Sequence, residues 1–181
     1  MLLVRAIVIA LLGLATGSFL NVLIDRIPKD LSILGRSHCD HCHKTLGILD
    51  LIPVLSYLFL GGKCRYCGKE INIRNPVVEV ATACLFVLTF LYLQNFNIEL
   101  LFYLFIISSL ITIFFIDLKH QIIPDKIIYP SILVSLLYLI FNDQALLLNH
   151  FFSALGALLF FLTLFTTTSG RGLGFGDVKL G

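Results

Sequence analysis

The chain has 181 residues, of which 58% are hydrophobic and only 13% are charged, and its mean hydropathy is +0.97. This composition is far more apolar than that of soluble globular domains, so it excludes an ordinary water-soluble enzyme or binding domain. The formal net charge is only +2. Because such charges meet anionic lipid head groups, they indicate a lipid bilayer and no nucleic acid as partner.

The apolar residues are gathered into blocks of membrane-spanning length. The first block begins near the N-terminus, but it is long, lacks a small-residue cleavage site and runs into a polar region, so we interpret it as a retained helix. The pattern predicts an all-α polytopic membrane protein with about five transmembrane helices. The predicted helices occupy residues 2–24, 77–93, 98–116, 127–141 and 145–166.

The distribution of lysine and arginine predicts the orientation of these helices. Of the thirteen basic residues, eight lie between the first two apolar blocks and four follow the third and fifth blocks, whereas the opposite turns, residues 94–97 and 142–144, contain none. Cytoplasmic loops carry the excess of positive charge, so the basic side is predicted to be the cytoplasm. The predicted domains are a first transmembrane helix at 1–24, a small cytoplasmic loop domain at 25–76 and a helical membrane domain at 77–181.

The predicted loop domain contains two cysteine pairs, Cys39 with Cys42 and Cys64 with Cys67, separated by 21 residues. A lysine and an aliphatic residue follow each pair at the same distances, so the two segments form a short internal repeat. This repeat predicts two zinc-knuckle-like loops that face each other across one structural zinc ion held by four thiolates. Two disulfides or a redox pair are the alternative, which a reducing cytoplasm disfavours. Three nearby histidines are expected to be exposed, although they could replace a thiolate: His38, His41 and His43.

Two acidic residues at the predicted cytoplasmic boundary form a candidate catalytic pair. Asp117 directly follows the third apolar block, and Asp177 follows a glycine-rich stretch after the fifth block. A charge inside a span costs about 2.5–3.5 kcal/mol on insertion scales, so each acid needs a partner, water or a function. Two carboxylates in one site share a proton, so one can activate water while the other protonates the leaving group, as aspartic peptide hydrolysis requires. The alternative for Asp117 is a charged helix end that meets water.

Neighbouring residues would shape this site. Gly174 and Gly176 lack a Cβ, so the backbone can turn sharply there and an extended peptide can come close. Asp125 lies eight positions after Asp117, and Lys179 lies two positions after Asp177. We expect Asp125 to be structural or to contact a basic substrate. Lys179 would either shape the site or form a surface ion pair.

These motifs together resemble those of the type IV prepilin leader peptidases, which are polytopic aspartic proteases of bacteria. The resemblance covers nearly the whole chain, and several independent motifs occur in the order of the family. Asp117 matches the first catalytic motif, and Asp177 matches the second catalytic aspartate in the GxGD motif. The matching segments are GSFLNV at 17–22, RIP at 26–28, DLIPVLS at 50–56, NPVVE at 75–79, Asp117 with Pro124-Asp125, and GFGDVK at 174–179.

The resemblance implies an activity, cofactors and partners. Members of this family cleave a short basic leader from type IV prepilins or type II secretion pseudopilins, after a glycine, at the cytoplasmic side of the bacterial inner membrane. Asp117 and Asp177 would then be catalytic, and residues 77–181 would form the peptidase domain. Many members also methylate the new N-terminal amine with S-adenosylmethionine, which makes this cofactor implied here. Glu79 is the candidate residue for binding it.

Two departures from the family pattern qualify these expectations. Some members have a glycine shortly after the motif that contains Glu79, where this chain has Ala81-Thr82-Ala83. The family normally continues beyond the GxGD motif with further apolar helices, whereas this chain stops at Gly181. We therefore expect a truncated product that lacks the helices that would close the site.

Three other classes of protein fit parts of the sequence. A presenilin or signal-peptide-peptidase type also uses a GxGD aspartate, but its Pro-Ala-Leu motif is absent here and it has no reason to carry a four-cysteine loop. A proton-coupled transporter would place acids along a path in mid-membrane, not at one boundary. A zinc-dependent membrane scaffold without catalysis is distinguished from a protease by incubation with a prepilin-like peptide.

Overall fold

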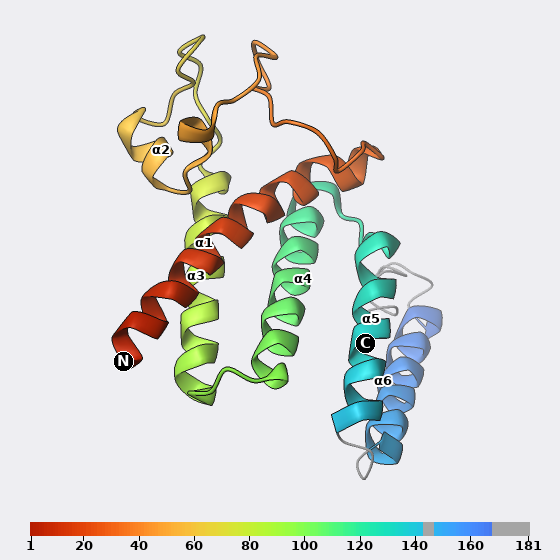
Figure 1. Ribbon diagram of the computed structural model, residues 1–181. Coiled ribbons are helices and arrows are strands. Elements are labelled where there is room, and N and C mark those ends of the chain that lie inside the picture. The colour runs from red at the N-terminus through yellow and green to blue at the C-terminus, as the bar shows by residue number, and fades with distance from the viewer. Residues whose placement is uncertain (143–146, 168–181) are drawn as a thin grey trace. The chain divides into compact units, whose positions relative to one another are not determined.

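Figure 1 shows the computed structural model of the protein, which describes residues 1–142 and 147–167. Those two ranges consist of helices and loops and contain no β-strand, so the predicted all-α class is confirmed. The only strand-like pairing described is two isolated antiparallel bridges, one in each cysteine loop. In chain order the helices are α1 (Leu2–Arg26), η1 (Ile27–Lys29), η2 (Ile48–Leu51), α2 (Leu55–Phe59), α3 (Arg74–Leu93), α4 (Ile98–His120), α5 (Asp125–Asn142) and α6 (Leu147–Thr167).

Within the described residues, five helices are long and apolar enough to cross a membrane, which confirms the predicted number. Many of their apolar side chains are exposed in the protein alone; Leu3 and Phe160, for example, are 74% and 59% exposed. Such surfaces need lipid in place of water. The membrane segments are Leu2–Lys29, Arg74–Leu93, Ile98–His120, Asp125–Asn142 and Leu148–Thr167.

Two glycines let α1 approach α3 closely. Gly13 and Gly17 lie about one helical turn apart on α1, and a Cβ on either would come 2.6 Å from the Cα of Ala83 or Glu79, respectively. In membranes, small residues four apart permit this close backbone approach, and the van der Waals contact that results holds the helices together. α1 and α3, red and yellow-green in Figure 1, therefore pack directly against each other.

The buried core of this region joins three helices. Ile9 from α1, Phe86 and Phe90 from α3, and Leu100 and Leu104 from α4 form one cluster, and each is at most 6% exposed. Close packing of large side chains supplies dispersion energy, which is the main attraction available between helices in lipid. The cluster thus fixes α4 beside the α1–α3 pair.

A short turn at residues 94–97 reverses the chain between α3 and α4. Gln94 ends α3 in the left-handed region with φ +56. The Asn97 side chain accepts a hydrogen bond from the backbone N–H of Leu100 at 3.0 Å, which caps the start of α4. The turn thus brings the start of α4 beside the end of α3, where Leu100 and Leu104 pack against Phe86 and Phe90.

Internal contacts group residues 1–116 into one compact unit and residues 117–181 into a second. All four paired cysteines and Glu79 belong to the first unit. Asp117 begins the second unit, which also contains α5 and α6.

The tight α1–α3 contact predicts that Gly13→Ala lowers the stability of the protein. The new methyl group would lie 2.6 Å from the Cα of Ala83, and overpacking of this kind typically costs about 1–3 kcal/mol. Gly156→Ala in α6 is the matched control, because nothing lies within 4 Å of a Cβ there, and alanine favours a helix by up to about 1 kcal/mol. Thermal unfolding in one detergent compares the two variants. A Gly13→Ala protein that melts at or above the wild-type temperature would contradict the close contact.

Candidate active site and metal centre

Two loops present the cysteine pairs with the same backbone hydrogen bonds. The N–H of Cys39 donates to the carbonyl five residues later at 3.0 Å, and the N–H of Cys64 does the same at 2.8 Å. In each loop the residue after the second cysteine, His43 or Gly68, donates back to the first cysteine, and both have a positive φ, 53° and 69°. The predicted internal repeat is therefore a repeat of structure.

The four sulfur atoms of Cys39, Cys42, Cys64 and Cys67 converge, with all of them within 4.8 Å of one another. The Sγ atoms of Cys39 and Cys67 are 3.8 Å apart, and all four cysteines are free thiols. Four thiolates bound tetrahedrally at about 2.3 Å would lie about 3.8 Å apart. The group can thus hold one metal ion. The three histidines near the first pair are exposed and do not belong to this group, as predicted.

The thiol of Cys67 holds its proton firmly when no metal is bound. The backbone N–H of Lys69 lowers the pKa of Cys67, whereas desolvation and the thiols of Cys64, Cys42 and Cys39 together raise it further, so that the pKa is about 11. Because an ion binds thiolates, its binding must release protons from this group.

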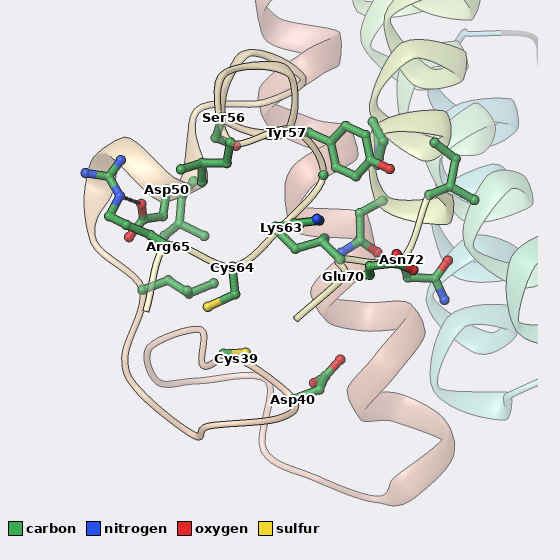
Figure 2. Close-up of a pocket in the computed structure, with 18 of the residues that line it drawn as sticks. Cys39, Asp40, Asp50, Ser56, Tyr57, Lys63, Cys64, Arg65, Glu70 and Asn72 are labelled. Carbon is green, nitrogen blue, oxygen red and sulfur yellow. Dashed lines mark ion pairs between the residues drawn. The ribbon is translucent and has the colours of Figure 1, made fainter. Parts of the chain in front are cut away.

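Asp50 connects the second cysteine loop to the segment that follows the first loop. Its Oδ1 lies 2.7 Å from Nε of Arg65, as Figure 2 shows. Its Oδ2 accepts hydrogen bonds from the backbone N–H of Gly47 at 3.1 Å and from the hydroxyl of Tyr66 at 3.4 Å. The ammonium of Lys44 in the first loop lies 5.0 Å from the centroid of the Tyr66 ring. The carboxylate that opens the DLIPVLS segment therefore has a structural role.

Polar residues at the end of α1 connect this helix to α3 and to the loop domain. Asp25 forms an ion pair with Arg74 at the start of α3, with 2.7 Å between oxygen and nitrogen. The Asn21 side chain donates to the carbonyl of Asn75 at 3.0 Å. The hydrogen bond of Asn21 gives this residue of the GSFLNV segment a structural role, and the hydrogen bonds of Arg26 do the same for the first residue of the RIP segment. The Arg26 guanidinium donates to four loop carbonyls at 3.0–3.3 Å: those of Ser32, Ile33, Leu34 and Arg36.

The aspartates of the first catalytic motif flank the connection between α4 and α5. Asp117 lies exposed in the last turn of α4, and its carbonyl accepts the N–H of Gln121 at 2.8 Å where the helix ends. Asp125 is the first residue of α5 and is also exposed. The pairing of Asp117 with Asp177 stays a prediction, because four of the predicted site residues lie outside the described residues: Gly174, Gly176, Asp177 and Lys179.

Glu79 is buried in the second turn of α3, with 8% of its surface exposed. Its Oε2 accepts the N–H of Val54 at 2.7 Å, and the Ser18 hydroxyl hydrogen-bonds the same carboxylate. Val54 has φ +59 and ψ −48, and the N–H of Leu55 donates to the carbonyl of Pro53 across it. This is a strained γ-turn that a β-branched residue adopts only where its surroundings enforce it. The sequence pattern pointed to Glu79 but not to Val54 or Ser18, which no local motif connects to it.

Two family descriptions match the sequence. "Bacterial Peptidase A24 N-terminal domain" matches residues 11–93, which contain both cysteine pairs and Glu79. "Type IV leader peptidase family" matches residues 104–181, which contain both candidate catalytic aspartates. The chain belongs to the type IV leader peptidase family. The family resemblance predicted from the motifs is thus confirmed.

Other members of the family align over most of this chain, and those compared below bear the name "Prepilin leader peptidase/N-methyltransferase". The relative from Klebsiella pneumoniae is 36% identical over 182 residues, which cover 93% of this chain and 78% of the relative. The relative from Dichelobacter nodosus is 31% identical over 207 residues, with 95% and 71% covered. The relative from Myxococcus xanthus is 42% identical over 134 residues, which cover 72% of this chain but only 39% of that relative. No solved structure matches the chain significantly.

Proposed function

We propose that this member of the type IV leader peptidase family removes the leader from type IV prepilins or type II secretion pseudopilins at the cytoplasmic face of the bacterial inner membrane. The observation that carries this function is the match of residues 104–181 to the peptidase family, because this range contains both aspartate motifs in order. The names of the relatives from Klebsiella pneumoniae and Dichelobacter nodosus support the same substrate class. Residues 77–181 then form the peptidase domain.

Asp117 and Asp177 act as one acid–base pair in this mechanism. Two carboxylates that share a proton differ in role, so the ionised one takes a proton from the attacking water while the protonated one donates to the leaving amine. The exposure of Asp117 in the last turn of α4 supports this role, because the carboxylate can reach both water and an extended peptide.

The residues around the pair place the substrate. Gly174 and Gly176 leave room for an extended peptide backbone beside Asp177. Asp125, exposed at the start of α5, attracts the basic leader, and Lys179 shapes the site close to Asp177.

The cytoplasmic orientation follows from the charges of the loops. Twelve of the thirteen basic residues fall on the predicted cytoplasmic side, and only Arg5 does not. The four paired cysteines are free thiols, which suits a reducing compartment. The order of the helices supports the same orientation, because a chain that crosses the bilayer in α3 and again in α4 returns to the side from which it started.

The cofactors of the proposed function are zinc and S-adenosylmethionine. Zinc bound by all four paired cysteines has no open position for substrate, so it stabilises the loop domain and takes no part in the reaction. The names of the relatives include an N-methyltransferase, which supports methylation of the N-terminus that cleavage frees. S-adenosylmethionine supplies the methyl group as an electrophile, and the accepting amine nitrogen loses a proton.

Mass spectrometry of a prepilin co-expressed with this protein tests both steps at once. We expect the prepilin to lose its leader and the mature N-terminus to gain the mass of one methyl group. A prepilin that keeps its leader would contradict the peptidase function. A prepilin that is cleaved but carries no methyl group would contradict the transferase function alone.

A further inference from the structure

The chain turns back on itself where the first membrane segment ends. Asp30 takes a left-handed conformation with φ 53, and its N–H donates to the carbonyl of Ile27 at 3.1 Å. The N–H of Leu31 donates to the carbonyl of Arg26 at 3.0 Å. These two hydrogen bonds form a Schellman motif, which ends a helix and redirects the chain. Residues 31–36, here called the return segment, therefore start beside the last turn of the membrane segment.

Arg26 holds the return segment close to the end of the helix. The membrane segment extends to Lys29, so Arg26 lies one helical turn before its end. The level of the helix end is where the hydrocarbon core meets the lipid head groups. The backbone of the return segment is thus fixed near this boundary by the guanidinium, which donates at 3.0–3.3 Å to the carbonyls of Ser32, Ile33, Leu34 and Arg36.

Several backbone groups of the return segment are paired within the protein. Four carbonyls accept hydrogen bonds from Arg26. The N–H of Leu31 is bonded to the helix end, and the N–H of Leu34 donates to the hydroxyl of Ser32 at 3.2 Å. Backbone groups that lack a partner are costly away from water, so a segment that enters lipid has to satisfy them internally. The return segment meets this requirement at six of its backbone groups.

The return segment presents three large apolar side chains to its surroundings. Leu31, Ile33 and Leu34 are 56%, 47% and 82% exposed. Single exposed apolar residues are ordinary on a protein surface, but a group of them marks an interaction site. These three lie within four positions and directly follow a membrane helix whose own apolar side chains face lipid. They therefore continue the lipid-facing surface beyond the end of the helix.

A cavity of about 540 Å³ borders both the return segment and α1. Its apolar lining includes Phe19 and Val22 from the membrane helix and Leu31 from the return segment. Phe19 is 50% exposed. Arg26 and Lys29 line the cavity near the end of the helix. The lining is thus apolar within the span and basic at its end, which matches a phospholipid, whose acyl chains adjoin an anionic phosphate.

Two acids also line this cavity, Asp25 and Asp40. Asp25 is paired with Arg74, with 2.7 Å between oxygen and nitrogen. Asp40 thus leaves an excess of one positive charge from the two basic lining residues. The return segment and the helix end have the same sign of charge. Residues 26–36 carry three basic side chains and one acid, which gives a formal charge of +2.

We propose that the return segment is an interfacial anchor that inserts Leu31, Ile33 and Leu34 between the lipid head groups. Lys29 and Arg36, which are both exposed, bind the phosphates of anionic phospholipids. The guanidinium of Arg26 keeps the loop carbonyls from facing lipid unpaired. The anchor attaches the loop domain to the bilayer at a point outside the membrane helices. This inference depends neither on leader cleavage nor on methyl transfer.

Tryptophan fluorescence tests the insertion, because the chain contains no tryptophan and a single introduced one reports its own surroundings. The full chain with Leu34→Trp is reconstituted into phosphatidylglycerol vesicles with lipids brominated on their acyl chains, which quench tryptophan on contact. We expect quenching close to that of Phe19→Trp, in the span, and at least about threefold stronger than that of Tyr66→Trp. Tyr66 is 45% exposed in the second cysteine loop, and Figure 1 shows both cysteine loops extending away from the membrane helices.

Equal quenching of Leu34→Trp and Tyr66→Trp would overturn the proposed insertion. If Leu34→Trp is not recovered in membranes, Leu31→Trp makes the same measurement with the same expected ratio to Tyr66→Trp. The tryptophan might instead be shielded from lipid and change its emission when a prepilin leader peptide is added or the protein density is raised. In that case the return segment docks a peptide or a second copy, and our assignment is wrong.

Vesicles of different charge test the contacts with phosphate. Quenching of Leu34→Trp should rise about twofold or more as phosphatidylglycerol replaces phosphatidylcholine. This rise should be lost when Lys29→Gln and Arg36→Gln are added together. Lys69→Gln is the matched control, because Lys69 is an exposed basic residue of the second cysteine loop, and it should keep the rise. A rise that is absent in Leu34→Trp, or that survives both exchanges, would overturn the phosphate contacts.

Discussion

Exchange of either Asp117 or Asp177 for asparagine is expected to abolish leader cleavage while the protein still inserts into the membrane. Asparagine has nearly the same size as aspartate but can neither take a proton from water nor donate one to the leaving amine. Loss of positioned acid–base catalysis typically costs about 10²–10⁴-fold in rate. Because the two carboxylates work as a unit, the double variant should be no slower than either single variant. Mass spectrometry of a co-expressed prepilin measures the cleaved fraction.

The control for this experiment is Asp143→Asn. Asp143 belongs to neither aspartate motif, so its exchange should leave cleavage at the wild-type rate. Recovery of each variant in the membrane fraction shows that insertion is intact. Full turnover by Asp177→Ala would refute the proposed pair.

Replacement of Cys64 by serine is expected to remove the bound metal and to unfold the loop domain. Structural zinc sites of zinc-finger peptides contribute roughly 10–16 kcal/mol at neutral pH, far more than a small loop domain gains from its own core. Cys64 is the buried member of the four-cysteine group, so a hydroxyl there also leaves a void in place of sulfur. Elemental analysis of the purified protein should give about one zinc per chain for wild type and almost none for the variant. A strong chelator should lower the unfolding temperature of wild type in the same way.

Cys84→Ser provides the matched control for zinc binding. Cys84 lies in α3, is exposed and is not part of the four-cysteine group, so this exchange should change neither the zinc content nor the unfolding temperature by much. Because the proposed zinc site is structural, Cys64→Ser should reduce stability more than the chemistry of cleavage. Unchanged metal content in Cys64→Ser would show that these thiols do not hold the ion.

The helices could be predicted well from the sequence, but their ends could not. Lipid selects for apolar composition over about twenty positions, which is visible without any tertiary information. The apolar blocks therefore located the five membrane helices of the described residues. However, α4 continues from the predicted end at residue 116 to His120, because helical hydrogen bonding does not stop where polarity begins. It stops where Gln121 takes a positive φ of 53°.

Some parts of the candidate site could likewise be predicted from the sequence, whereas others could not. The cysteine pairs could be predicted to share one ion, because each pair chelates through residues three apart and the two pairs repeat the same loop. The sequence did not identify two residues as structural: Asp50, whose carboxylate binds the second cysteine loop and Gly47, and Arg26, whose guanidinium holds four loop carbonyls. Their partners are backbone groups or residues of another loop, and such contacts leave no periodic pattern in a sequence.

The sequence by itself determined the membrane class, the number of helices, the four-thiolate group and the order of the two aspartate motifs. Each of these depends on composition or on short spacings along the chain. Only the tertiary structure decided that Glu79 is buried behind α1, bonded to Val54 and open to a cavity. That arrangement requires the close approach of α1 to α3 at Gly13 and Gly17 and a strained turn held from 25 residues away. Long-range packing, and not local preference, places such a turn, because its own backbone energy opposes it.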